Sequence, residues 1–421
     1  MAAATRRLVG REAELAAVVA LLDDPDELPG VAVLEGEAGI GKTAVWLAVL
    51  DAAAARGFRV LSTRPSDVEA GWSYSGLADL IGNAAAEVLP RLPSVQHRAL
   101  EAALLLGEDG HVTDERAVAA ATLSALRVLA EEQPVVIAVD DVQWLDAATL
   151  AALRFALPRL ESEPIAAVLA ARGSTPEWLL RAVAVERRRL REIGPLSLGA
   201  THELLRMHLD AAFARPTMVR IWETSRGNPF FALELAAALQ RRGGTLAVGE
   251  ELPVPTSLGA LLRGRLDGLD AAAVEVAQVV AALAEPTVQL DETIVEPFEA
   301  GLAEAFEARI LELDGERLRF THPLLGPAVA GRLTPPQRLA LHARLARFAH
   351  TSEQRARHLA LATDDPDADI AAALEDAARE AHARGASAAA AELAERAAIL
   401  VELGPGAVSY THLTLPTNRE V

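Results

Sequence analysis

The sequence contains no cysteine among its 421 residues. Disulfide bonds and thiolate catalysis are therefore excluded, and a reducing compartment fits this composition. Aromatic residues are also scarce, at 4% of the chain, although 51% of the residues are hydrophobic. The hydrophobic residues are mainly alanine, leucine and valine, and such a composition favours helices over strands.

Long apolar runs and excess positive charge are missing as well. No segment approaches about 18 apolar residues without a charge, and residues 1–7 lack the apolar core of a signal peptide. The 40 basic and 59 acidic residues give a formal net charge of −19. This charge argues against non-specific binding of the whole chain to nucleic acid or to a membrane surface. We expect a cytoplasmic protein of about two to four domains with no membrane partner.

Lysine is almost absent, because Lys42 is the only one and every other basic residue is arginine. Lys42 lies in a GxxxxGKT motif at residues 36–43, between an apolar strand (residues 31–34) and an apolar helix (residues 44–55). In this context the loop amides and the helix N-terminus converge on phosphate oxygens. The alternative, a glycine-rich turn before a core helix, is disfavoured by this strand–loop–helix context.

The motif predicts that the chain binds ATP or ADP together with Mg²⁺. Lys42 is expected to reach the β- and γ-phosphates, and the Thr43 hydroxyl is expected to hold the Mg²⁺. The candidate nucleotide-binding residues of the loop are Gly36, Gly39, Ile40, Gly41, Lys42 and Thr43.

A second apolar strand, residues 134–139, ends in the adjacent carboxylates Asp140 and Asp141. A buried strand that delivers an Asp at its carboxyl end suits the Mg²⁺-binding role in P-loop NTPases. Asp140 is then expected to act on Mg²⁺ through water, and Asp141 to orient or activate the attacking water. Alone, such a run is also compatible with a structural Asp before a turn; its pairing with the phosphate loop favours the functional interpretation.

Arginines near two further segments are candidates for different roles. Arg172 ends the apolar strand at residues 164–172, so the switch-point rule for open α/β sheets places it on the nucleotide side. The alternative for Arg172 is a solvated charge at a strand end. Arg187, Arg188 and Arg189 with Arg191 form a basic cluster, which we interpret as a solvated helix face and not as a nucleic-acid site.

The order of the predicted elements indicates an α/β P-loop NTPase with an AAA-like parallel sheet, followed by helical parts. A strand–turn–strand pattern around Asp314 and Gly315, preceded by helices, indicates a winged-helix-like domain. The Ala-rich helices after it look like the helix pairs of tetratricopeptide-like (TPR-like) repeats. The predicted parts are an ATPase domain (1–195), a helical lid (196–250), a winged-helix-like domain (251–340), the start of the repeats (341–407) and a non-native tail (408–421).

The tail differs in composition from what precedes it and resembles a translated vector or adaptor sequence. We therefore expect the natural protein to continue beyond Ala407.

Taken together, the motifs resemble the STAND class of P-loop ATPases, specifically the ATPase core of large LuxR-type, MalT-like bacterial regulators. The motifs that carry the resemblance are Val-Gly-Arg-Glu at 9–12, the phosphate loop, Asp-Asp-Val-Gln-Trp-Leu-Asp at 140–146, Gly-Asn-Pro-Phe-Phe at 227–231, and Arg-Phe-Thr-His-Pro-Leu at 319–324. No single one except the phosphate loop is specific.

This resemblance implies a signal-gated ATPase switch. ADP locks the ATPase domain, the lid and the winged-helix domain together, and ATP with a small-molecule or protein inducer on the helical repeats opens them into a homo-oligomer. Relatives bind promoter DNA through a C-terminal helix-turn-helix, which these residues do not encode.

The resemblance also assigns candidate nucleotide contacts. Val9, Gly10 and Arg11 line the adenine pocket, and Pro229 packs on adenine. Arg172 is placed like the sensor arginine near the γ-phosphate. His322 is placed to reach the β-phosphate of ADP, and a capping or packing role is the alternative for it.

Two other functions are compatible with the phosphate loop. One is a P-loop enzyme, such as a phosphotransferase or an ATP-driven motor; the sequence shows no signature of an acceptor substrate. The other is a scaffold that holds ADP without hydrolysing ATP; the two carboxylates Asp140 and Asp141 argue against it.

Overall fold

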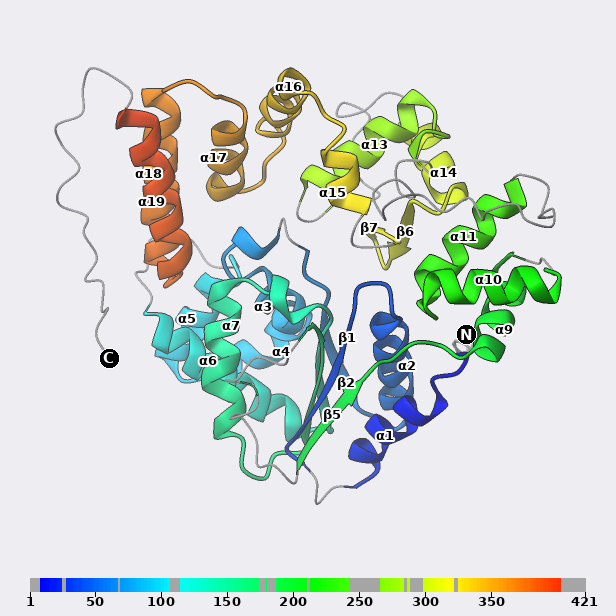
Figure 1. Cartoon of the computed structure of the whole chain (residues 1–421). Coiled ribbons are helices and arrows are strands. Elements are labelled where there is room, and N and C mark those ends of the chain that lie inside the picture. The colour runs from blue at the N-terminus through cyan, green and yellow to red at the C-terminus, as the bar shows by residue number, and fades with distance from the viewer. Residues whose placement is uncertain are drawn as a thin grey trace.

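The computed structural model of the chain describes residues 8–24, 28–66, 69–106, 114–173, 187–209, 213–241, 266–283, 298–321 and 325–402, together with residues 179, 286 and 287. Figure 1 shows one sheet with helices on both sides and a further, mainly helical part that extends along the sheet's upper edge. The predicted tail, residues 242–265 around the predicted boundary between the lid and the winged-helix-like domain, and His322 lie outside the described residues.

The sheet has five parallel strands in the order β2-β3-β4-β1-β5. The strands are β1 (Gly30–Gly36), β2 (Arg59–Thr63), β3 (Val135–Val139), β4 (Ile165–Arg172) and β5 (Arg188–Glu192). Gly36 lies opposite Arg172 and Thr63 lies opposite Val139, so the strands end at about the same level. The residues that follow each strand therefore gather along one edge, as the sequence predicted.

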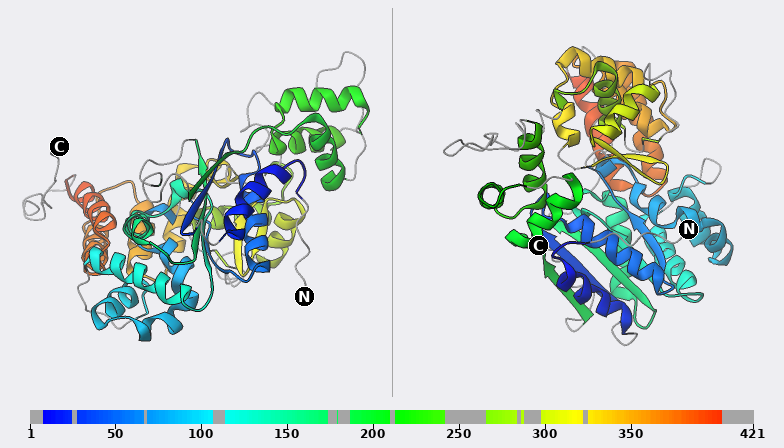
Figure 2. Two further views of the ribbon diagram at one scale, coloured as in Figure 1. Left: turned by 90° about the horizontal axis from the view of Figure 1, so that it is seen from below. Right: turned by 90° about the vertical axis from the view of Figure 1, so that its right-hand side faces the viewer.

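The sheet is covered on both faces, which is why β1, β3 and β4 are continuously apolar. Alternate side chains point to opposite faces. Ala32 and Leu34 of β1 pack with α1 (Glu12–Asp23) and α2 (Lys42–Ala55). Val31 and Val33 belong to the core of the other face. The two layers of helices are visible from below in Figure 2.

The second face is covered by helices from two stretches of the chain. They are α3 (Ser75–Ile81), α4 (Ala85–Val88), α5 (Ser94–Ala103), α6 (Glu115–Ala130) and α7 (Ala147–Ala156). Asp114 caps the N-terminus of α6, and Asp146 caps that of α7 by accepting a hydrogen bond from the Thr149 amide. Asp146, the last residue of the motif at 140–146, therefore has a structural role as a helix cap.

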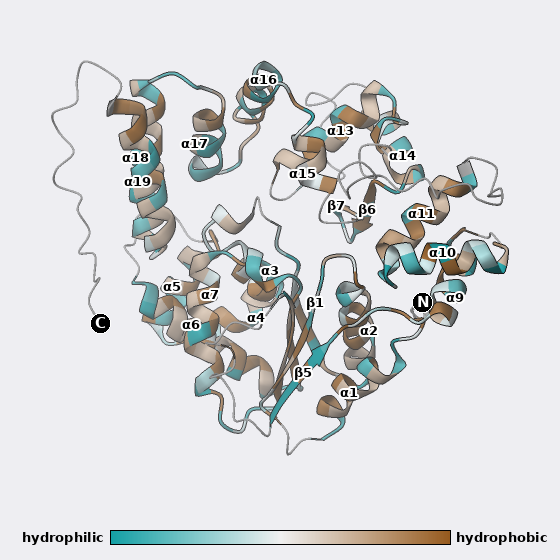
Figure 3. Ribbon diagram, viewed as in Figure 1, coloured by the Kyte–Doolittle hydropathy of each residue, from teal (hydrophilic) through white to brown (hydrophobic). Residues whose placement is uncertain are grey.

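One prediction about this domain is wrong. The arginines at 188, 189 and 191 lie on β5 and not on a helix face. β5 is an edge strand that pairs with β1 alone among the described strands, so its other side has no strand beside it. Charged side chains are favoured on an edge strand because they discourage pairing with another chain. Figure 3 shows the resulting contrast, with β5 hydrophilic beside a hydrophobic sheet.

Three short helices follow the sheet, within the segment that was predicted as a helical lid (196–250). They are α9 (Leu198–Leu209), α10 (Arg215–Ser225) and α11 (Pro229–Arg241). Leu205, Ile221 and Leu235 form the centre of a small core of their own. The segment is therefore helical, and its role as a lid stays a prediction; we refer to α9, α10 and α11 as the lid.

The next part contains the predicted β-hairpin. Its elements are α13 (Ala271–Ala282), α14 (Phe298–Glu307), β6 (Leu311–Asp314), β7 (Arg317–Phe320), α15 (Leu325–Ala330) and α16 (Pro335–Leu345), which share one core. Asp314 pairs with Arg317, so the two turn residues are Gly315 and Glu316. The positive φ of 64° at Gly315 explains why the turn requires glycine there.

The last described helices are α17 (Ser352–Leu361), α18 (Ala368–Ala383) and α19 (Ser387–Glu402). Leu374 and Leu393 pack into the same core as α3 to α7, so this helical part rests on the sheet domain. The Tyr74 hydroxyl donates a hydrogen bond of 3.1 Å to the carbonyl of Gly385 across this contact. Within the described residues, we find no helix of the length and apolar character that crossing a membrane requires.

Candidate nucleotide-binding site

The glycines of the phosphate loop hold the backbone open at the start of α2. Gly41 has a φ of 102°, which side chains with a Cβ rarely adopt, and it is the N-cap of α2. Because glycine has no side chain, nothing from this N-cap occupies the amides of the first turn. The loop and the helix N-terminus therefore form the anion-binding arrangement that the motif predicts.

Lys42 folds back over the loop. Its Nζ donates to the carbonyls of Gly36 and Glu37, at 2.9 Å each, and the residue is buried. Burial lowers the pKa of Lys42, and the negative charge of Asp141 opposes that shift. The amino group is thus placed within the loop, where a bound phosphate would exchange for the two carbonyls.

Thr43 and Asp140 meet at the mouth of the loop. The Thr43 hydroxyl donates to Asp140 Oδ2 at 2.8 Å. Asp140 is only 4% exposed, and its Oδ1 has no hydrogen-bond partner among the described residues. Burial, reinforced by the neighbouring charge of Asp141, raises the pKa of Asp140. A buried carboxylate oxygen next to a hydroxyl fits Mg²⁺, which prefers oxygen ligands, so these two residues would hold the ion.

Asp141 and Arg172 pair at the same edge. Arg172 Nη2 lies 3.2 Å from Asp141 Oδ2, and Arg172 Nε donates to Oδ1 at 3.4 Å. Gln143 supports the pair by donating its Nε2 to Asp141 Oδ1 and accepting from the Arg172 amide. Arg172 thus lies on the nucleotide side of the sheet, as the sequence predicted, and its side chain is engaged by a carboxylate.

Arg64 is a site residue that the sequence analysis missed. It directly follows β2, and its Nε lies 3.6 Å from Asp140 Oδ2. On its other side, Nη1 donates to Asp314 Oδ2 of the hairpin at 3.1 Å. The signal that located Arg172, an arginine at the carboxyl end of a strand of this sheet, would also have located Arg64.

The lid touches the phosphate loop through the start of α11. Asn228 Nδ2 donates to the Ala38 carbonyl at 3.0 Å, and the Phe230 amide donates to the Gly39 carbonyl at 3.3 Å. A Cβ added to Gly41 would lie 3.9 Å from Pro229 Cγ, so the proline ring borders the loop. Asn228 was not predicted as a site residue, although an Asn before a helix is a capping signal.

The segment Val9–Arg11 lies beside the same loop. Arg11 Nη2 donates to the carbonyls of Ile40, at 2.9 Å, and Gly194, at 2.6 Å. Gly10 has a φ of 65°, and a Cβ there would come within 2.6 Å of Ala200. Arg11 therefore ties the loop to the chain that leaves β5, while the adenine contacts of this segment stay a prediction. The phosphate contact of His322 also stays a prediction.

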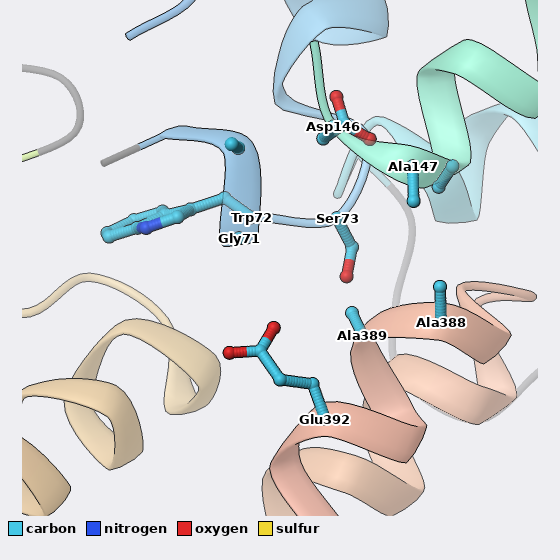
Figure 4. A pocket seen from close by; sticks show the side chains of 10 residues that line it. Gly71, Trp72, Ser73, Asp146, Ala147, Ala388, Ala389 and Glu392 are labelled. Atoms are coloured by element: carbon cyan, nitrogen blue, oxygen red, sulfur yellow. The ribbon is translucent and has the colours of Figure 1, made fainter. Parts of the chain in front are cut away.

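A small cavity opens beside Asp146, between the ATPase domain and α19 (Figure 4). Its volume is about 70 Å³, and it is lined by Gly71, Trp72 and Ser73 on one side and by Ala388, Ala389 and Glu392 on the other. The space suits a few water molecules and is too small for a nucleotide. This cavity is therefore separate from the phosphate loop.

Comparisons with known proteins agree with this geometry. The sequence of residues 7–169 matches the family described as AAA ATPase domain. A search of curated proteins gave no match.

Among solved structures, the chain is similar to a Signal Transduction ATPase with Numerous Domains (STAND) protein with a tetratricopeptide repeat sensor from Pyrococcus horikoshii. The identity is 14% and the TM-score 0.59, over 94% of this chain and 54% of that one. This chain therefore spans about half the length of that protein.

Two further structures overlay less closely. They are a Walker-type ATPase of Pyrococcus abyssi, at 14% identity and a TM-score of 0.37, and Cdc6p from Pyrobaculum aerophilum, at 16% and 0.39. Each match covers 77% of this chain, and 97% and 94% of the respective relative. The parallel sheet, the match of residues 7–169 to the AAA ATPase domain family and the fold similarity to the STAND protein together show a P-loop NTPase fold with a helical C-terminal region.

Proposed function

We propose that the chain is the ATPase core of a STAND-class, LuxR-type transcriptional regulator, locked by ADP and opened by ATP with an inducer. The observation that carries this proposal is that three later parts of the chain converge on the domain near its nucleotide edge. Asn228 of the lid contacts the phosphate loop, Asp314 of the hairpin contacts Arg64, and α17 and Gly385 contact residues 71–74. These contacts support the proposal that one nucleotide holds several parts together.

The C-terminal contact is polar and buried. Glu353 of α17 accepts from the Ser73 hydroxyl at 3.3 Å and pairs with Arg357 and Arg384. Arg357 also donates to the carbonyl of Gly71. Separating the members of such a buried ionic network leaves charges without their partners, which is costly in free energy. The contact is therefore sensitive to any ligand that moves these helices.

The fold similarity to a STAND protein with a tetratricopeptide repeat sensor supports this assignment. We propose that an inducer, a small molecule or a protein, binds the helical repeats that begin near α17, and that the open form assembles into a homo-oligomer. The regulator would act in the cytoplasm and bind DNA through a helix-turn-helix that these residues do not encode.

The chemistry follows from the residues at the sheet edge. Lys42 would bind the β- and γ-phosphates, and Thr43 with Asp140 would hold Mg²⁺, which neutralises phosphate charge when bound. Asp141 would orient the attacking water, but its oxygens are engaged by Arg172 and Gln143. While Arg172 and Gln143 occupy its oxygens, Asp141 cannot hydrogen-bond to an attacking water, so we propose slow hydrolysis that requires Arg172 to leave Asp141. The same pairing also favours the second candidate, a scaffold that holds ADP without hydrolysis.

A nucleotide analysis tests the proposal. The purified chain is denatured, the released nucleotide is identified, and ATP turnover is measured for the unmodified chain and for Lys42→Ala and Asp140→Ala. We expect bound ADP and slow turnover that both variants abolish. Fast turnover independent of any added ligand would contradict the switch, and turnover at background level would favour the scaffold. Absence of nucleotide binding would contradict the phosphate-loop assignment itself.

A further inference from the structure

Arg64 connects two parts of the chain that are far apart in sequence. It is held at the sheet edge because it directly follows β2, whose last residue Thr63 accepts a hydrogen bond from the Asp140 amide at 3.0 Å. The guanidinium of Arg64 therefore lies beside Asp140, the carboxylate that we expect to hold Mg²⁺. Its side chain is 18% exposed, which limits screening of its charge by solvent.

On its other side, Arg64 faces two carboxylates of the hairpin. Nη1 lies 3.1 Å from Asp314 Oδ2, and Nη2 lies 3.7 Å from Glu312 Oε1. Arg319 of the hairpin completes the contact by donating to the Arg64 carbonyl and by pairing with Asp314. One cation is thus shared between an inner carboxylate of the nucleotide site and two outer carboxylates of another part of the chain.

A second contact fixes the hairpin at the same strand end. Arg317 pairs with Asp79, and Asp79 accepts from the Thr63 hydroxyl at 2.8 Å. The hairpin is therefore held against both Thr63 and Arg64 at the carboxyl end of β2. Figure 1 shows β6 and β7 above the edge where β1 and β2 end.

We propose that Arg64 is a positioning residue that couples Mg²⁺ binding at Asp140 to docking of the β6–β7 hairpin. The inference rests on the proposed nucleotide site and adds to it a means of regulation. A divalent cation held by Asp140 is repelled by the positive charge of Arg64. Glu312 and Asp314 reduce that repulsion while the hairpin is docked. Mg²⁺ then binds more tightly to the docked form, and by reciprocity bound Mg²⁺ favours docking.

The experiment is a double-mutant cycle on the full chain, read out as the Mg²⁺ concentration for half-maximal binding of fluorescent mant-ADP. The double substitution Glu312→Gln, Asp314→Asn is expected to raise this midpoint about threefold, which is the effect expected from the loss of a partly exposed charge interaction. Arg64→Gln alone is expected to lower it. In the Arg64→Gln background, the hairpin substitutions are expected to have no further effect on the midpoint.

Three controls make the result specific. Glu316→Gln removes a charge from the exposed turn of the same hairpin and is expected to leave the midpoint unchanged. Arg64→Lys keeps the positive charge and is expected to restore the effect of the hairpin substitutions. Because the chain has no cysteine, Leu313→Cys accepts a single fluorescent label, whose anisotropy is expected to fall when Arg64→Gln releases the hairpin.

Two results would overturn the coupling while the unmodified chain binds mant-ADP with Mg²⁺. One is an unchanged midpoint in the Glu312→Gln, Asp314→Asn variant. The other is a shift of the same size with and without Arg64. Failure of the unmodified chain to bind the nucleotide at any Mg²⁺ concentration would overturn the proposed function, and this inference with it.

Discussion

The guanidinium of Arg172 and the carboxylate of Asp141 form an ion pair at the edge of the sheet, with 3.2 Å between Nη2 and Oδ2. Both residues were predicted as catalytic: Asp141 from its place after a buried strand, and Arg172 from its place at the end of one and from the family resemblance. Their direct contact means that neither group is available to a nucleotide while the other holds it. The pair is therefore a natural point of control over hydrolysis.

Arg172→Ala is expected to lower ATP turnover by about a hundredfold, the effect of removing one group that stabilises developing phosphate charge. ADP binding is expected to change little, because Lys42 and the loop amides remain. Steady-state turnover and mant-ADP affinity measure the two effects. Arg154→Ala, on the exposed side of α7, serves as the control. Equal losses of affinity and turnover would indicate that Arg172 holds the fold and has no separate role in hydrolysis.

Asp140→Asn is expected to stabilise the nucleotide-free chain. Burial raises the pKa of Asp140 in the folded state, so its ionised form opposes folding, and this cost grows as pH rises through that pKa. The amide removes the cost. At mildly alkaline pH we expect the melting temperature of the variant to be about 2–4 °C higher than that of the unmodified chain, which corresponds to about 1 kcal/mol in the free energy of unfolding. In acid, we expect the two melting temperatures to be equal.

The same variant is expected to lose the additional stabilisation that Mg²⁺ gives to the ADP-bound chain. Asp376→Asn, on an exposed carboxylate, is the control for loss of charge. A lower melting temperature for Asp140→Asn without nucleotide would show that its charge supports the fold.

Asn228 combines two roles that substitutions can separate. Its Oδ1 caps α11 by accepting from the amides of Phe230 and Phe231, and its Nδ2 donates to the Ala38 carbonyl. Asn228→Asp keeps the cap and loses the donor, whereas Asn228→Ala loses both. Stopped-flow release of mant-ADP is expected to be faster in both variants. Only the alanine variant is expected to lose about 1 kcal/mol of stability from the missing cap. Unchanged release in the Asp variant would dissociate the lid contact from nucleotide retention.

The stability of the C-terminal part is expected to depend on pH through His358. This residue is 3% exposed and stacks on His342, with ring centroids 5.3 Å apart. Burial, with a further contribution from His342, lowers the pKa of His358 from 6.5 to about 4. The unfolded chain then binds the proton more tightly than the folded chain does. The contribution of the neutral His358 to the free energy of unfolding is therefore complete above about pH 6.5 and is lost as pH falls toward about 4.

At about pH 5 the expected loss from His358 is about 2 kcal/mol. Denaturant titrations of the unmodified chain and of His358→Gln at neutral and acidic pH measure it, since the variant lacks this part of the pH dependence. Identical pH profiles would show that the imidazole is not buried in its neutral form. His350→Gln, at an exposed histidine between α16 and α17, is the matched control.

Local sequence patterns sufficed to predict much of the fold and part of the site. The phosphate loop, the Asp after β3 and the Arg at the end of β4 are each defined by a short apolar strand and the residues next to it. Parallel pairing then brings Thr43 and Asp140 together, because the carboxyl ends of such strands share one edge. The turn at Gly315 was predictable for a similar reason, since it needs a positive φ.

Contacts between distant parts could not be predicted in the same way. Asp314 is 250 positions from Arg64, and its choice of partner depends on how the hairpin packs on the sheet. Asn228 and Ala38 are 190 positions apart and meet because the lid packs on the loop. β5 was mistaken for a helix because its run of arginines has no alternation, and only its pairing with β1 defines it.

The most direct test compares hydrogen exchange in the ADP-loaded chain and in the chain stripped of nucleotide. If one nucleotide holds the parts together, ADP with Mg²⁺ is expected to slow exchange at the phosphate loop and also at the start of α11 and in the β6–β7 hairpin. Protection confined to the phosphate loop, with unchanged exchange in α11 and the hairpin, would contradict the proposed clamp.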